Sequence, residues 1–131
     1  MPGGVATEIH LVSEDTGGAF CLLVDHPPPG WSLPTHTHAN EAETIHIVEG
    51  EFEMEVDGRH IQLAAGETVH LPRGTPHSGA NVGSQTGRRI VLFSPGGMER
   101  FFLEAGQPTA EAEADLGAAL ACALRHGWEF L

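Results

Sequence analysis

The sequence predicts a chain that is mostly β-strand and ends in a helical segment. Apolar and polar residues alternate over short stretches between residues 7 and 93, which is the period of strands with one buried face. Glycine- and proline-rich turns separate these stretches, and Asp57-Gly58 is a typical two-residue hairpin turn. Towards the end, leucines recur every four residues from Leu116, which is a helical period. An all-β domain with a short C-terminal helical tail is therefore expected.

The first part of this pattern contains two strands and a rigid loop. The stretch 7–12 alternates weakly and is predicted to be a strand, and 19–24 is an apolar run typical of a strand buried on both faces. Three consecutive prolines then precede Gly30. Because proline has no N–H to donate to a strand ladder, we expect a loop here.

The middle of the chain alternates most clearly. If Glu43 points inward, Ile45 and Ile47 share its face. The stretch 51–56 places apolar side chains on one face and glutamates on the other, and 59–63 continues the pattern after the hairpin turn. These two stretches are expected to pair as an antiparallel hairpin.

Two more strands and two helices complete the prediction. Strands are expected at 68–71 and 88–93, and a short helix at 98–104. Thr109 can cap a longer helix, whose last turn ends at Gly127. The narrow leucine stripe of that helix is expected to pack on the outside of the β domain or to form an oligomer contact.

Composition and charge narrow the classes of function. The 131 residues suit one domain, and 18 acidic residues against six basic ones give a net charge of −12, which disfavours nucleic acid and anionic membranes as partners. No stretch approaches the roughly 20 apolar residues of a membrane span, and no secretion leader is evident, so a cytoplasmic protein is expected. Cys21 and Cys122 are far apart in sequence and are expected to be buried and reduced.

Three histidines and a glutamate form the most informative chemical pattern. His36 and His38 are two residues apart, so on one strand they project to the same side, about 7 Å apart at the backbone. Glu43 would add a carboxylate oxygen, and His77 a third nitrogen from a distant strand. This set suits a divalent transition metal and leaves positions open for a ligand. Glu41 shares the parity of Glu43, so spacing alone leaves either as the carboxylate ligand.

These side chains belong to two blocks of fixed spacing, residues 30–50 and 66–81. The ten fixed positions are Gly30, His36, His38, Glu43 and Gly50, followed by Gly66, Pro72, Gly74, His77 and Asn81. Without a departure, they resemble the two signature motifs of the cupin superfamily. The resemblance implies a double-stranded β-helix, or jelly-roll, barrel. On this reading the barrel domain spans residues 1–97, and residues 98–131 form a helical tail packed on it.

The resemblance also implies what the site does. It makes His36, His38, Glu43 and His77 the metal ligands, and it favours Glu43 over Glu41. The metal would be one divalent ion of Fe, Mn, Ni, Co or Zn, because all of these accept such ligands. The expected partner is a small-molecule substrate or ligand. Its pocket is expected to be lined by apolar residues, namely Trp31, Leu33, Ile47, Phe52 and Met54.

Several functions remain compatible with this family. The stretch that follows Phe93 resembles the small quercetin-dioxygenase-like members, which suggests a dioxygenase of a small oxygenated aromatic substrate, with Glu43 as ligand and catalytic base. Cupins also include isomerases and non-enzymatic binding proteins. A ligand-binding sensor, or a metal-dependent isomerase of a sugar or keto acid, are therefore the alternatives. Because cupins commonly pair through strands near the N-terminus, a homodimer involving 7–12 is expected.

Overall fold

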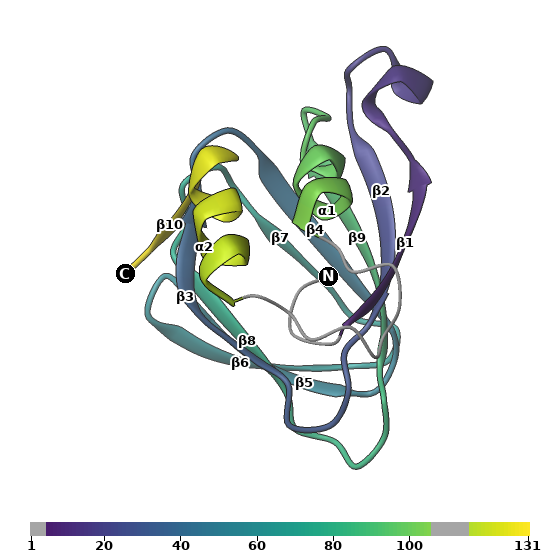
Figure 1. Ribbon diagram of the computed structural model, residues 1–131. Coiled ribbons are helices and arrows are strands. Elements are labelled where there is room, and N and C mark those ends of the chain that lie inside the picture. The colour runs from purple at the N-terminus through teal and green to yellow at the C-terminus, as the bar shows by residue number, and fades with distance from the viewer. Residues whose placement is uncertain (1–4, 106–115) are drawn as a thin grey trace.

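The structure is a computed structural model that describes residues 5–105 and 116–131. Within these ranges, two five-stranded antiparallel sheets enclose the interior (Figure 1). In spatial order, the first sheet consists of β1 (Ala6–Leu11), β2 (Cys21–His26), β9 (Arg88–Ser94), β4 (Ala42–Glu49) and β7 (Thr68–Leu71). The second consists of β10 (Trp128–Phe130), β3 (Ser32–His38), β8 (His77–Asn81), β5 (Glu51–Val56) and β6 (Arg59–Ala64). The all-β prediction is confirmed.

The core lies between the inner faces of the two sheets. In β4 the predicted alternation is observed, since Glu43, Ile45 and Ile47 are buried while the residues between them are partly exposed. From the facing sheet, β5 contributes Phe52 and Met54. One buried face per strand is what drives the two sheets together, because apolar area is removed from water on both sides.

The hairpin between β5 and β6 forms at the predicted turn. Val56 pairs with Arg59, which leaves Asp57 and Gly58 as the two turn residues. Both have positive φ, 51° and 81° respectively. Left-handed backbone at both positions is what the tight, right-twisted hairpin turn requires, and Asp-Gly tolerates it.

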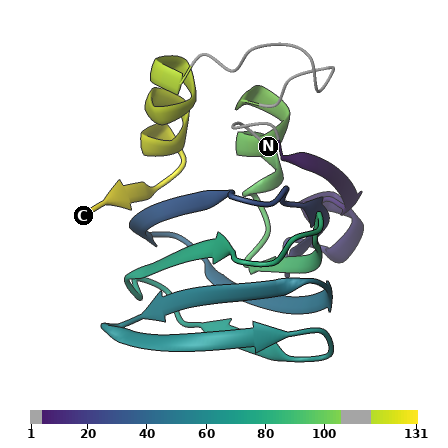
Figure 2. The same cartoon turned by 90° about the horizontal axis from the view of Figure 1, so that it is seen from below.

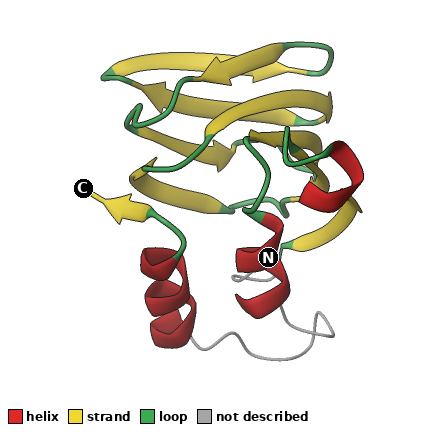
Figure 3. Cartoon of the chain, turned by 90° about the horizontal axis from the view of Figure 1, so that it is seen from above, coloured by secondary structure: helices red, strands yellow, loops and turns green. Residues whose placement is uncertain are grey.

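Two helices lie on the same side of the sheets (Figures 2 and 3). They are α1 (Glu99–Ala105), close to its expected position, and α2 (Leu116–Arg125). The expected cap at Thr109 lies outside the described residues. Gly127 has φ 87°, as predicted for the residue that ends the helix. The expected leucine stripe is wrong at its end: Leu124 is 54% exposed, because α2 buries Cys122 and Ala123 instead.

The strand β10 was not predicted. After Gly127 the chain returns to the second sheet, where Trp128 pairs with His38 and Phe130 with His36 at the edge of β3. The tail therefore contributes a strand as well as helices. Among the described residues, no helix is long and apolar enough to cross a membrane. Cys21 and Cys122 are buried and not joined in a disulfide, as expected.

Candidate metal centre

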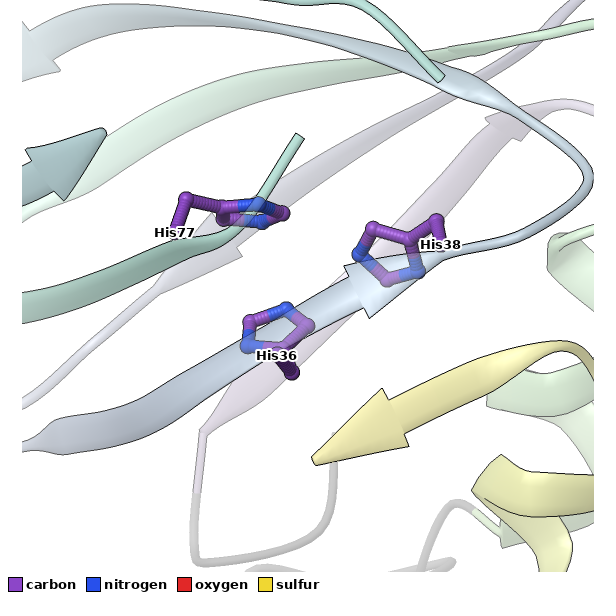
Figure 4. Close-up of side chains that lie close together, drawn as sticks. All are labelled: His36, His38 and His77. Carbon is purple, nitrogen blue, oxygen red and sulfur yellow. The ribbon is translucent and has the colours of Figure 1, made fainter. Parts of the chain in front are cut away.

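Three histidine rings gather inside the barrel (Figure 4). His36 and His38 come from the end of β3 and His77 from the start of β8, where His36 and His77 are direct partners in the ladder. One ligand nitrogen of each lies within 4.8 Å of the others. All three side chains are buried. The spacing that places His36 and His38 on one face of a strand thus brings them together with a residue about forty positions away.

Glu43 joins this cluster from the opposite sheet. Its Oε1 lies 3.3 Å from His38 Nε2 and 3.2 Å from His77 Nε2. Oε1 is buried, and despite these short distances it makes no hydrogen bond within the described residues. The four predicted side chains therefore converge. The carboxylate oxygen that lies close to two imidazole nitrogens has no hydrogen-bond partner among the described residues.

Backbone carbonyls fix the orientation of two of the rings. His36 Nδ1 lies 2.8 Å from the carbonyl oxygen of Pro34, and His77 Nδ1 lies 2.9 Å from that of Thr75. Because a carbonyl only accepts, Nδ1 carries a proton in both rings, so the neutral form of each ring keeps its lone pair on Nε2. Such a partner on the far nitrogen is typical of metal-binding histidines.

The cluster shifts the pKa values of its members. Burial, helped by the neighbouring histidines, lowers the pKa of His36 to about 4, so this ring is neutral at pH 7. Burial alone would raise the pKa of Glu43, but the His38 and His77 side chains outweigh it and hold the pKa below its usual range. Burial would lower the pKa of His77, and the Glu43 carboxylate reverses this and raises it. The carboxylate is therefore ionised and His36 is available as a ligand at neutral pH.

The residues present fit a divalent metal ion. The buried atoms Glu43 Oε1 and His38 Nδ1 have no hydrogen-bond partner among the described residues, which is costly in a dry interior. A cation among the nitrogens would satisfy the carboxylate oxygen and the ring lone pairs together. Three imidazoles and one carboxylate are a common donor set for iron, manganese, cobalt, nickel and zinc.

Glu41, the other candidate carboxylate, lies elsewhere. It is buried, and burial raises its pKa. It does not line the cavity beside the three rings, and the short contacts to His38 and His77 are made by Glu43. The structure therefore places Glu43 rather than Glu41 at the cluster. A second group of potential ligands, Glu104, Cys122 and His126, lies between the helices. Glu104 is already hydrogen-bonded there by Arg125 and His126, which accounts for its position.

A cavity lies beside the cluster. It is partly open to solvent. Of the five expected pocket residues, Trp31, Leu33 and Met54 line it together with the three histidines and Glu43. Ile47 and Phe52 do not; both are buried in the core, at 0% and 2% exposure. Strand parity predicts which face a residue occupies but not how far along the barrel it lies.

Trp128 is a site residue that the sequence prediction missed. Its ring stacks on His36, with centroids 4.7 Å apart and planes 14° apart, and meets His38 edge-on at 4.5 Å. Its Nε1–H donates to Met98 Sδ at 3.2 Å. The alternation of Trp128, Glu129 and Phe130 after a helix-ending glycine was a signal for a short strand.

Comparison with known proteins identifies the family. The model of the cupin domain family matches residues 23–93, more than half of the chain, and this range includes all four converging side chains. The chain is a cupin. Its two sheets accordingly form the double-stranded β-helix that the motifs predicted.

Individual relatives agree with this assignment. The cupin is 31% identical over 108 residues to quercetin 2,3-dioxygenase of Bacillus subtilis. The matched region covers 82% of this chain and 32% of that enzyme. The chain thus spans about a third of that relative. The polyketide cyclase RemF of Streptomyces resistomycificus is 27% identical with a TM-score of 0.61, over 71% of this chain and 68% of that one. KdgF of Halomonas sp. shares the fold at 22% identity, with a TM-score of 0.66 over 74% and 84% of the two chains.

Proposed function

We propose that this cupin is a metal-dependent enzyme of the dioxygenase type, acting on a small oxygenated aromatic molecule. His36, His38, Glu43 and His77 would hold one divalent metal ion. The observation that supports this most is the convergence of three imidazoles on an unsatisfied buried carboxylate beside a cavity with apolar walls. Apolar walls with a few converging polar groups are typical of sites for small organic molecules.

The ion would supply Lewis acidity and, if it is iron or manganese, redox chemistry with dioxygen. The chain's own residues hold and orient it: the Pro34 and Thr75 carbonyls keep the Nε2 lone pairs of His36 and His77 free. Trp31, Leu33 and Met54 line the cavity beside the cluster and provide surface for an aromatic ring. Orienting the reacting groups in this way removes much of the entropic barrier to their encounter.

Glu43 would accept the proton of a substrate hydroxyl group. The two imidazoles keep its carboxylate ionised, and Oε1 has no donor among the described residues. In this proposal a phenolic O–H in the cavity would donate its proton to the same carboxylate group that helps to hold the metal. A positioned base of this kind typically contributes 10²- to 10⁴-fold to a rate.

The comparison with quercetin 2,3-dioxygenase supports the reaction class, because that enzyme matches most of this chain. The chain covers only a third of it, so the reaction itself is our proposal. The match to a polyketide cyclase involves a different named activity. A reaction that consumes no oxygen is therefore the alternative to be tested.

The experiment measures oxygen uptake by the iron- and the manganese-loaded protein with a panel of flavonols and catechols. We expect uptake by the wild type and loss of at least 100-fold in Glu43→Gln, which keeps an oxygen atom but cannot take a proton. Glu41→Gln is the matched control and should retain activity, because Glu41 does not line the cavity. If no aromatic compound causes uptake or perturbs the metal spectrum in the wild type, the proposal fails in favour of a binding, isomerase or cyclase function.

A further inference from the structure

A single cation lies in the interior among the described residues. The chain has six arginines and no lysine, and all six arginines lie within the described ranges. Five of them are exposed, whereas Arg89 is only 6% exposed. Arg89 lines the same cavity as His36, His77 and Glu43. Arg89 is not one of the predicted metal ligands, so the metal site does not explain why this residue is buried beside it.

The guanidinium of Arg89 is fixed on several sides. Its Nε and Nη2 donate to Asp25 Oδ1 and Oδ2 at 2.9 and 2.7 Å, and the two residues are partners in the ladder between β2 and β9. Its central carbon lies 4.8 Å from the centroid of the Trp31 ring and 5.4 Å from that of Phe52. The group is therefore held in place before any ligand enters the cavity.

One edge of this guanidinium remains unused. A guanidinium has two edges that can each bind a carboxylate through two parallel hydrogen bonds. Asp25 occupies the Nε and Nη2 edge, and the guanidinium donates no other hydrogen bond within the described residues. The edge formed by Nη1 and the second N–H of Nη2 thus has no acceptor among the described residues, and it is available to a ligand in the cavity that Arg89 lines.

Stability alone does not account for the pair. Replacing a buried ion pair by apolar side chains is often neutral or stabilising. A cavity wall that binds only through apolar surface would need neither Asp25 nor Arg89. The pair is instead what a site requires if one end of the ligand is anionic and the rest is apolar.

We propose that Arg89, positioned by Asp25, binds a carboxylate group of the ligand, and that the cavity accepts a small aromatic carboxylate. This inference rests on the proposed function, because it takes the cavity beside the histidines to be the substrate site. The free guanidinium edge matches a carboxylate in shape and charge, and Trp31, Leu33 and Met54 provide the surface for a ring. The net charge of −12 repels anions in general, so a carboxylate ligand needs a local, oriented cation of this kind.

The test is titration of benzoate, with benzamide as the neutral match, into the full-length protein stripped of metal. Calorimetry should give saturable binding of benzoate at least tenfold tighter than benzamide. Arg89→Lys keeps a positive charge beside Asp25 but lacks the free guanidinium edge. The affinity for benzoate should therefore fall by about 10- to 100-fold, which corresponds to the loss of one or two charge-assisted hydrogen bonds. Arg88→Gln, at the exposed neighbour, should bind benzoate as the wild type does.

Equal affinity for benzoate and benzamide, or benzoate binding that is unchanged in Arg89→Lys, would overturn the proposal. If Arg89→Lys does not fold, the guanidinium ¹⁵N resonance of Arg89 in the wild type decides the matter: it should shift with benzoate and not with benzamide. Neither measurement needs metal, oxygen or turnover. A protein that binds benzoate through Arg89 but consumes no oxygen would contradict the dioxygenase reaction and leave the carboxylate site standing.

Discussion

Trp128 stacks on His36 in almost parallel planes, so the C-terminal strand forms one wall of the histidine cluster. Two segments about ninety residues apart in sequence are thereby joined at the candidate metal centre. The stack also explains why the end of β3 is buried over three consecutive residues rather than alternately, since β10 covers this edge of the sheet.

Removing this ring should loosen the site. We expect Trp128→Ala to lower the free energy of unfolding by about 3–5 kcal/mol, as for other buried aromatic truncations. Metal affinity should fall roughly tenfold, because the ring that holds His36 in place is lost. Trp31→Ala is the matched control, since Trp31 lines the cavity without stacking on a histidine, and its metal affinity should be unchanged. Equal metal affinity in Trp128→Ala and the wild type would show that the stack does not position His36.

Removing metal should lower the stability of the whole fold. An ion that binds only the native state stabilises it by mass action, by about 2.7 kcal/mol when its concentration is 100 times the Kd. We therefore expect chelator to lower the melting temperature of the wild type, and divalent metal to restore it. A chelator effect of the same size in His38→Ala would mean that the stabilising ion binds at another place.

Acid should destabilise the metal-free protein through His36. Burial lowers the pKa of His36 to about 4 in the folded state, whereas the unfolded value is near 6.5. Between these values the unfolded chain binds more protons at this residue, so stability falls as the pH drops from 6.5 towards 4, by up to about 3 kcal/mol. The raised pKa of His77 acts in the opposite direction, because it adds stability that is present below 6.5 and is lost as pH rises through the folded value.

Urea unfolding of metal-stripped protein at pH 7 and pH 4.5 checks this pH dependence. His36→Asn should lose less stability between the two pH values than the wild type, because the residue that is penalised for protonation is gone. His60→Asn, at an exposed histidine, provides the control. If His36→Asn and the wild type respond equally to acid, burial of His36 does not set the acid limit.

The homodimer remains a proposal, and β1 is the strand that would mediate it. Among the described residues β1 is the edge strand of the first sheet, and an edge strand can pair with a second chain. We expect light scattering at micromolar concentration to give twice the monomer mass. Thr7→Pro should weaken the dimer, whereas Thr68→Pro, on the opposite edge strand β7, should not. A monomeric wild type would contradict the proposal.

Much of this architecture could be predicted because it follows local rules. Two-residue periodicity puts His36 and His38 on one face, and Asp57-Gly58 can form the tight hairpin turn without help from the rest of the fold. Depth along the barrel does not follow from periodicity, and Ile47 and Phe52, which were expected in the pocket, lie in the core beyond this cavity. The role of Trp128 depends on a strand of three residues, whose alternation is a weak signal and whose pairing with β3 cannot be read from local sequence. The Asp25 and Arg89 pair likewise depends on the register between β2 and β9.

The most direct test of the central claim is the metal content of protein purified without a metal-chelating tag. Elemental analysis should give about one divalent transition metal ion per chain in the wild type. His36→Ala, His38→Ala and His77→Ala should each lose most of it, whereas His70→Ala, an exposed histidine bonded to Thr44, should retain it. Metal content that is unchanged in all three cluster variants, or a wild type that takes up no metal when it is supplied, would contradict the assignment of this site.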